Sequence, residues 1–284
     1  MLQTFDEPTA SVAHVAAGHP AAPGLRGPRM EPVSSGPAAV RLFNGRFDPV
    51  TLDGCVDTVF NDMARGRRGW LCTVNVAILM MMREDTKLQS FVDRAGWTVA
   101  DGQPLIWAAR WFRRALPERV TGVDLVYRLC ERAEQQGQGV YLLGATSTTV
   151  RRLAERLQAR YPQLTLSFAD GYFSNDEAEQ RADAVALSGA SILLVGMGVP
   201  RQEHFIESQF DRLGVQLAVG VGGSFDVLAG LRSRAPQWMQ NAGLEWLFRL
   251  VQEPRRLFKR YLLTNSKFVG LLLRALVLPR HRDC

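Results

Sequence analysis

From Val40 onward, short runs of apolar and β-branched residues alternate with longer stretches in which apolar positions recur every three or four residues. Runs of the first kind predict strands, and stretches of the second kind predict helices. The predicted strands span 69–73, 98–100, 140–143, 164–168, 192–195 and 216–219. The predicted helices span 53–64, 77–84, 104–113, 123–135, 148–159, 176–186 and 201–212. This alternation predicts an α/β fold: a mostly parallel, Rossmann-like sheet with helices on both faces.

The pattern divides the chain into three regions. Residues 1–39 are rich in Ala, Pro and Gly and show no apolar periodicity, which predicts a disordered leader. Residues 40–234 carry the alternation and form the expected α/β catalytic domain. Residues 235–284 contain no strand pattern, and two helical stretches, 236–249 and 255–278, predict a C-terminal helical appendage.

The positive charge of the chain is concentrated in this appendage. Residues 244–284 hold nine Lys or Arg and three Asp or Glu, so they carry the whole net charge of +6. Such asymmetry indicates an anionic partner: a membrane surface, a nucleic acid or a phosphate-bearing substrate. Because apolar residues recur there on a helical spacing, we favour a basic amphipathic helix on an anionic bilayer. Packing of that helix on the core or on a second subunit is the alternative, so a homo-oligomer is left open.

The composition is that of a globular protein without a bilayer-spanning segment. Hydrophobic residues make up 46% of the chain and charged residues 22%. A helix that spans a bilayer needs about 20 consecutive apolar residues, and no apolar run in the sequence is that long. The four cysteines form no CxxC pair, which argues against a disulfide framework or a zinc site. We therefore expect a cytoplasmic protein.

Polar residues follow the first two predicted strands of the sheet. Thr73 and Asn75 end one strand, and Asp101 ends the next. Carboxyl ends of parallel strands meet at one edge, so a carboxylate there could act as general base toward a hydroxyl nucleophile. Capping of the helices that follow is the alternative for Asn75 and Asp101, and spacing alone favours it.

Three glycine-rich loops follow other predicted strands. They are Gly144-Ala145-Thr146-Ser147, Gly196-Met197-Gly198-Val199-Pro200-Arg201-Gln202-Glu203 and Gly220-Val221-Gly222-Gly223-Ser224-Phe225-Asp226. Glycine lets a phosphate approach the backbone, and free N–H groups at a helix start bind anions. Each loop alone could be an ordinary strand–turn–helix corner, but together they indicate a nucleotide diphosphate site. Gly196, Gly198, Gly222 and Gly223 are the candidate backbone contacts.

Several common motifs are absent from the sequence. It contains no GxxxxGK[ST] and no GxGxxG, which excludes a P-loop kinase and weakens a nicotinamide-dependent oxidoreductase. It also lacks Asp-x-Asp, and its four histidines assemble neither a metal site nor a Ser–His–Asp triad, with His204 expected on a helix surface. We therefore expect no metal and no cofactor.

These loops and strand ends resemble those of the WecG/TagA/CpsF glycosyltransferases, glycosyltransferase family 26. The resemblance covers roughly residues 41–262. Besides the loops above, it is carried by Thr73-Val74-Asn75, Ala100-Asp101-Gly102, the stretch 119–125, Arg234-Ala235-Pro236 and the tail stretches 245–250 and 253–256.

The resemblance implies roles for individual residues. Asp101 looks like the general base, with Thr73 beside it, and Asn75 and Gln202 look like substrate-positioning groups. Arg119 looks like a charged contact in the active-site cleft. The tail residues that would fold over the nucleotide and meet its diphosphate are Arg249, Arg256 and Arg260, with Lys259 as the alternative to the last. Family members act without a bound metal.

The implied reaction is inverting transfer of a sugar from a UDP-sugar to a polyprenyl-diphosphate-linked sugar at the inner face of the bacterial membrane. Transfer of glucose in exopolysaccharide assembly is slightly favoured by the Arg- and Ala-rich composition. Transfer of N-acetylmannosamine for a wall polymer or surface antigen is the alternative. Two rivals from other classes are the nicotinamide-dependent oxidoreductase and a non-catalytic module that docks a membrane or nucleic acid. No paired aromatic RNA-binding motif is visible, so we expect no nucleic-acid partner.

Overall fold

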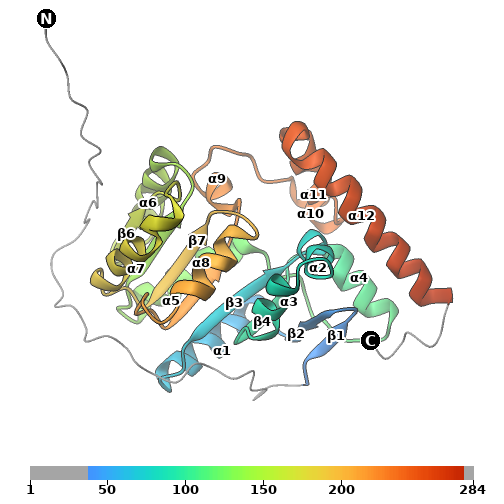
Figure 1. Ribbon diagram of the computed structural model, residues 1–284, viewed down its shortest axis with the longest axis horizontal. Coiled ribbons are helices and arrows are strands. Elements are labelled where there is room, and N and C mark those ends of the chain that lie inside the picture. The colour runs from blue at the N-terminus through green and yellow to red at the C-terminus, as the bar shows by residue number, and fades with distance from the viewer. Residues whose placement is uncertain (1–37, 278–284) are drawn as a thin grey trace, which may run out of the picture.

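The centre of the molecule is a six-stranded sheet in which every neighbouring pair of strands is parallel (Figure 1). The structure is a computed structural model that describes residues 38–277, apart from the side chains of Arg256 and Leu276. The strands are β3 (Gly69–Val74), β4 (Trp97–Ala100), β5 (Val140–Gly144), β6 (Leu166–Ala169), β7 (Ile192–Gly196) and β8 (Leu217–Gly220). Their order is β4-β3-β8-β7-β5-β6. All six predicted strands are present, and all six carboxyl ends lie at one edge.

Helices cover both faces of this sheet, as the sequence predicts. One hydrophobic core lies under α1 (Leu52–Ala64), α5 (Gly122–Gln135), α6 (Ser147–Arg160) and α9 (Ser224–Leu228). The other lies under α2 (Val76–Met82), α3 (Thr86–Asp93), α4 (Gln103–Trp111), α7 (Ala178–Leu187) and α8 (Arg201–Gln209). A short 3₁₀ turn, η1 (Asn175–Glu177), precedes α7. Successive residues of one strand point into opposite cores, as Trp70 and Leu71 of β3 do.

Some elements differ from the sequence prediction. A hairpin of β1 (Val40–Leu42) and β2 (Gly45–Phe47) and the helices α3 and α9 were not expected. β1, β2 and α9 are too short to show a period. The single helix expected at 236–249 is wrong. It is broken into α10 (Gln237–Asn241) and α11 (Glu245–Gln252) at Gly243, whose φ of 66° belongs to the left-handed region.

The long C-terminal helix α12 (Pro254–Val277) packs against α2 (Figure 1). Its buried residues lie on one stripe: Leu257, Tyr261, Thr264, Phe268 and Ala275. A second apolar stripe is about half exposed: Phe258, Leu262, Val269 and Leu273. At 3.6 residues per turn, the two stripes are separated by roughly a third of a turn. The apolar spacing in the tail therefore covers both a packed face and an exposed face.

No helix within residues 38–277 is long and apolar enough to cross a membrane. The expected leader, 1–39, lies almost wholly outside the described residues, as do residues 278–284.

The ends of β5 and β7 meet without room for a side chain, which yields a prediction. A Cβ added at Gly144 would lie 2.5 Å from the backbone of Gly196, and the φ of Gly144 is 150°. We expect Gly144→Ala to lower the free energy of unfolding by about 2–4 kcal/mol, as strain and overpacking add. Urea denaturation followed by circular dichroism measures it.

The matched control is Gly270→Ala in α12, where an added Cβ meets nothing within 4 Å. This change should be neutral or stabilise by about 0.5–1 kcal/mol, because alanine loses less backbone entropy in a helix. Equal denaturation midpoints for Gly144→Ala and the unchanged protein would contradict the close approach of β5 and β7.

Candidate active site

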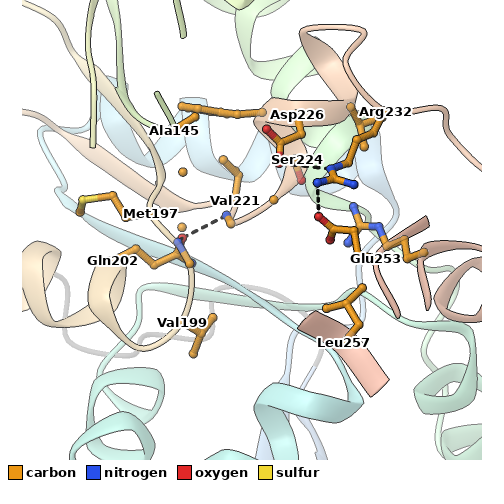
Figure 2. A pocket seen from close by; sticks show the side chains of 18 of the residues that line it. Ala145, Met197, Val199, Gln202, Val221, Ser224, Asp226, Arg232, Glu253 and Leu257 are labelled. Carbon is orange, nitrogen blue, oxygen red and sulfur yellow. Dashed lines mark hydrogen bonds and ion pairs between the residues drawn. The ribbon is translucent and has the colours of Figure 1, made fainter. Parts of the chain in front are cut away.

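A cavity of about 290 Å³ lies at the carboxyl edge of the sheet (Figure 2). Loops after all six strands of the sheet line it, and α11 and α12 close its side. The three glycine-rich loops contribute to the same wall, as expected from the sequence. Ten of the residues expected at the site line this cavity: Thr73, Asn75, Asp101, Gly196, Gly198, Gln202, Gly222, Gly223, Arg249 and Arg260. We call it the loop cavity.

Asp101 lies at the end of β4 and is not the cap of the helix that follows. Gly102 occupies the N-cap position of α4, so the capping alternative for Asp101 is wrong. The Asp101 carboxylate instead accepts the backbone N–H of Gly122, at the start of α5. Burial raises the pKa of Asp101 to about 6, although Arg249 and Arg119 favour the charged form. A carboxyl with this pKa suits proton transfer near neutral pH.

Thr73 and Asn75 lie beside Asp101 at the end of β3. The Thr73 hydroxyl donates to the carbonyl oxygen of Gly220 at 3.3 Å, which links β3 to the loop after β8. The Asn75 side-chain oxygen accepts the backbone N–H of Ile78 at 3.0 Å and caps α2, so the capping interpretation is correct for this residue. The cap does not use the amide NH₂ group, and Asn75 also lines the loop cavity.

Gln202 holds two glycine loops at a fixed spacing (Figure 2). Its Oε1 atom accepts the N–H groups of Gly198 and Gly222, at 3.2 and 3.0 Å. A Cβ at Gly220 would lie 2.5 Å from Gln202 Nε2, so a larger residue there would displace the Gln202 amide from this position. Gln202 Nε2 donates to Glu203 Oε1 at 2.7 Å. The amide of Gln202 is therefore engaged with the loops themselves.

Glu203 is a buried carboxyl beneath the loop cavity that the sequence analysis did not single out. Only 6% of the residue is exposed, and burial raises its pKa to about 7, opposed by the hydrogen bond from Gln202. The only sequence signal is its position directly after Gln202. Because it receives the Gln202 amide, Glu203 orients the side chain that spaces the loops.

The arginines of the site fall into two groups. Arg119 lies outside the loop cavity and pairs with Glu245 of α11 at 2.6 Å. Arg232, which the sequence analysis missed, lies between Asp226 and Glu253 and links α9 to the end of α11 (Figure 2). In contrast, no carboxylate among the described residues lies within ion-pair distance of Arg249. This arginine can face an anionic ligand.

Two expectations for the tail concern positions in α12. Arg260 lines the loop cavity, and Lys259 does not. The Arg260 guanidinium lies 5.3 Å from the ring centre of Tyr261, a further lining residue. Arg256 lies in α12, but its side chain is outside the described part of the chain.

Candidate metal ligands are scattered. Within residues 38–277, no three His, Cys, Asp or Glu side chains lie close enough together to hold a metal ion. His204 is exposed on α8, as predicted, and Cys55, Cys72 and Cys130 are buried and free.

The raised pKa of Asp101 yields a stability prediction. Its folded pKa of about 6 exceeds the about 3.9 of an unfolded aspartate, so the wild type loses stability as pH rises through this interval. Asp101→Asn removes this dependence. Relative to wild type, we expect the variant to gain about 2 kcal/mol between pH 4.5 and pH 8, measured by urea denaturation at both pH values.

Asp124→Asn serves as a control of opposite sign. Burial raises the pKa of Asp124, but hydrogen bonds from Arg234, at 2.6 Å, and Thr121 outweigh burial and lower it overall. Asp124 therefore stabilises the wild type at pH values above the pKa of an unfolded aspartate. Relative to wild type, the free energy of unfolding of Asp124→Asn should fall more at pH 8 than at pH 4.5. If the free energies of unfolding of the two variants, relative to wild type, changed in the same direction between pH 4.5 and pH 8, the opposite pKa shifts assigned to Asp101 and Asp124 would be refuted.

Comparison with known protein families agrees with the geometry of this edge. A family model described as glycosyl transferase WecG/TagA/CpsF family matches residues 40–282, which includes every strand of the sheet and the appendage. The chain thus belongs to the WecG/TagA/CpsF family of glycosyltransferases.

Proposed function

We propose that this glycosyltransferase moves a hexose from a UDP-sugar to a hydroxyl of a polyprenyl-diphosphate-linked sugar, with inversion at the anomeric carbon. One observation carries the proposal: a carboxyl with a pKa of about 6 lies in a cavity walled by glycine loops and arginines. A nucleotide diphosphate matches the loops, and a hydroxyl nucleophile needs the base. Family membership supports sugar transfer as the reaction class.

In the proposed mechanism, the acceptor hydroxyl gives its proton to the Asp101 carboxylate. Its oxygen forms a bond to the anomeric carbon, and the bond from that carbon to the diphosphate oxygen breaks. The electron pair leaves with UDP, whose new charge Arg249 and Arg260 stabilise. Thr73 and Asn75 position the reacting groups beside Asp101, and Gln202 fixes the spacing of the loops around the diphosphate.

We also propose that transfer needs no divalent metal. The support is chemical: arginine side chains reach the cavity where the diphosphate would lie, and planar guanidinium donors match phosphate oxygens.

The composition of the chain bears on the sugar and on its biological use. Glucose and exopolysaccharide assembly in a Gram-negative bacterium remain slightly favoured by the composition, and N-acetylmannosamine for a wall polymer or surface antigen is the alternative. A non-catalytic membrane module would need neither the loops nor a base. A nicotinamide enzyme of the classic type has strands in the order 3-2-1-4-5-6, whereas the six strands here, renumbered 1–6 along the chain, run 2-1-6-5-3-4.

A donor screen tests the proposed function. Purified protein in EDTA is given UDP-glucose, UDP-N-acetylmannosamine and other UDP-sugars with a short-chain polyprenyl-diphosphate monosaccharide. We expect one donor to be consumed, and Asp101→Asn to lower kcat roughly 10²–10⁴-fold because the base is lost.

The control is Asp85→Asn, which changes a true helix cap on the surface, at the start of α3. Asparagine replaces aspartate well as a cap, so the rate should stay near wild type. Near-wild-type turnover by Asp101→Asn would remove Asp101 from the mechanism, and rescue by added Mg²⁺ or Mn²⁺ would refute metal independence.

We further propose that the appendage, residues 235–284, docks the protein on the cytoplasmic face of the cell membrane. The exposed apolar stripe of α12 and the net charge of the tail support this, because basic amphipathic helices bind anionic bilayers. Each Lys or Arg near such a surface contributes about 1 kcal/mol.

Liposome sedimentation tests this placement. We expect the wild type to sediment with anionic vesicles at low salt and the variant Phe258→Ser/Leu262→Ser/Leu273→Ser to stay in solution. None of these three residues lines the loop cavity, so turnover on the short-chain acceptor should persist. A wild type that ignores anionic vesicles would disprove the membrane role.

A further inference from the structure

A second cavity, of about 400 Å³, adjoins the loop cavity at Asp101. Residues of α4, α11 and α12 line it, so we call it the α4–α12 chamber. The lining residues that it shares with the loop cavity are Asn75, Ala77, Asp101, Ser224, Arg249 and Tyr261. Asp101 and Arg249 therefore lie at the junction of two spaces, and a group in either can approach the same carboxylate.

The chamber differs from the loop cavity in chemistry. Its wall is rich in large aromatic side chains: Trp107, Trp111, Trp246, Tyr261 and Phe268. Trp107 and Trp111 are 46% and 63% exposed, and both line the chamber, so their rings are accessible to a ligand there. Such rings bind sugar faces and hydrocarbon chains rather than charged phosphates.

The chamber also opens toward the exposed apolar stripe of α12. Val269 belongs to that stripe, is 52% exposed and lines the chamber. An apolar chain in the chamber could therefore continue onto the exposed side chain of Val269. A nucleotide has no group that needs such a path.

Charge within the chamber is confined to the end near Asp101. Its charged lining residues are Asp101, Arg119, Glu245 and Arg249. Arg119 is 14% exposed and lines the chamber but not the loop cavity. Its guanidinium has five N–H donors, more than its pair with Glu245 can use, so donors remain for a phosphate.

We propose that the α4–α12 chamber binds the acceptor: its sugar lies against Asp101, its diphosphate lies beside Arg119, and its first isoprenoid units pack on Trp107, Trp111 and Val269. This assignment rests on the proposed function, because it names the site of that reaction's second substrate. It gives the two substrates separate cavities that meet at the base.

Binding and kinetics with matched tryptophan variants test the assignment. Trp111→Ala removes an exposed chamber residue, and the control Trp238→Ala removes an equally exposed tryptophan, 65% exposed on α10, that does not line the chamber. Equilibrium dialysis with labelled farnesyl diphosphate, without vesicles, measures acceptor-side binding. We expect Trp111→Ala to raise Kd about tenfold or more and Trp238→Ala to leave it unchanged.

Steady-state kinetics add a second readout with the farnesyl-diphosphate monosaccharide as acceptor. For Trp111→Ala we expect a raised KM for the acceptor, with an unchanged KM for the UDP-sugar and an unchanged thermal shift with UDP. Equal effects of both variants on farnesyl diphosphate, or a raised KM for the donor, would overturn the chamber assignment.

The dialysis result also separates this inference from the proposed function. Selective loss of farnesyl diphosphate binding by Trp111→Ala supports the chamber even if no UDP-sugar is transferred. Transfer by a protein whose Trp111→Ala variant binds both substrates normally would support the reaction and refute the chamber.

Discussion

The active edge depends on strands that end without side chains. β5, β7 and β8 end at Gly144, Gly196 and Gly220, and a Cβ at any of them would lie within about 2.6 Å of a neighbouring atom. At Gly144 that neighbour is the backbone of β7, and at Gly220 it is the amide of Gln202. Because nothing projects from these ends, one glutamine can reach both Gly198 and Gly222 and hold the two loops together. The space left above them is the loop cavity.

Asp101 illustrates the conflict between stability and reactivity. A carboxylate surrounded by protein loses hydration, and here burial outweighs the favourable fields of Arg249 and Arg119. The N–H of Gly122 and the start of α5 recover part of the loss. Arg249 and Glu245 both come from α11 and act on Asp101 in opposite directions. The proton affinity of Asp101 therefore depends on how α11 packs on the domain.

The sequence predicted the sheet edge well because its signals are local. Each buried strand is a short apolar run followed by a polar residue or glycine, and parallel strands bring those ends together whatever their order. The same rule placed Thr73, Asn75 and Asp101 side by side. Whether a polar residue caps a helix was less predictable, because Asn75 does and Asp101, in a similar setting, does not.

Long-range partners could not be read from the pattern. Arg119 pairs with Glu245 across 126 positions, and Arg232 links Asp226 to Glu253, so no local spacing marks either arginine. Gln202 was expected at the site, but its engagement by two backbone N–H groups depends on the folded loops. Gly243 was a visible signal for the break between α10 and α11, although the apolar spacing on both sides suggested one helix.

One helix, α12, lines both cavities and carries two apolar stripes. Periodicity groups residues on a face, but it cannot say which face finds a partner, and here only the stripe with Leu257, Tyr261 and Phe268 packs on the domain. That packing carries Arg260 and Tyr261 to the loop cavity and Phe268 to the chamber. The second stripe, with Phe258 and Val269, stays exposed beside the chamber. If it rests on a bilayer, as proposed, the helix that lines the loop cavity also places the chamber at the membrane surface, where the proposed lipid-linked acceptor would enter.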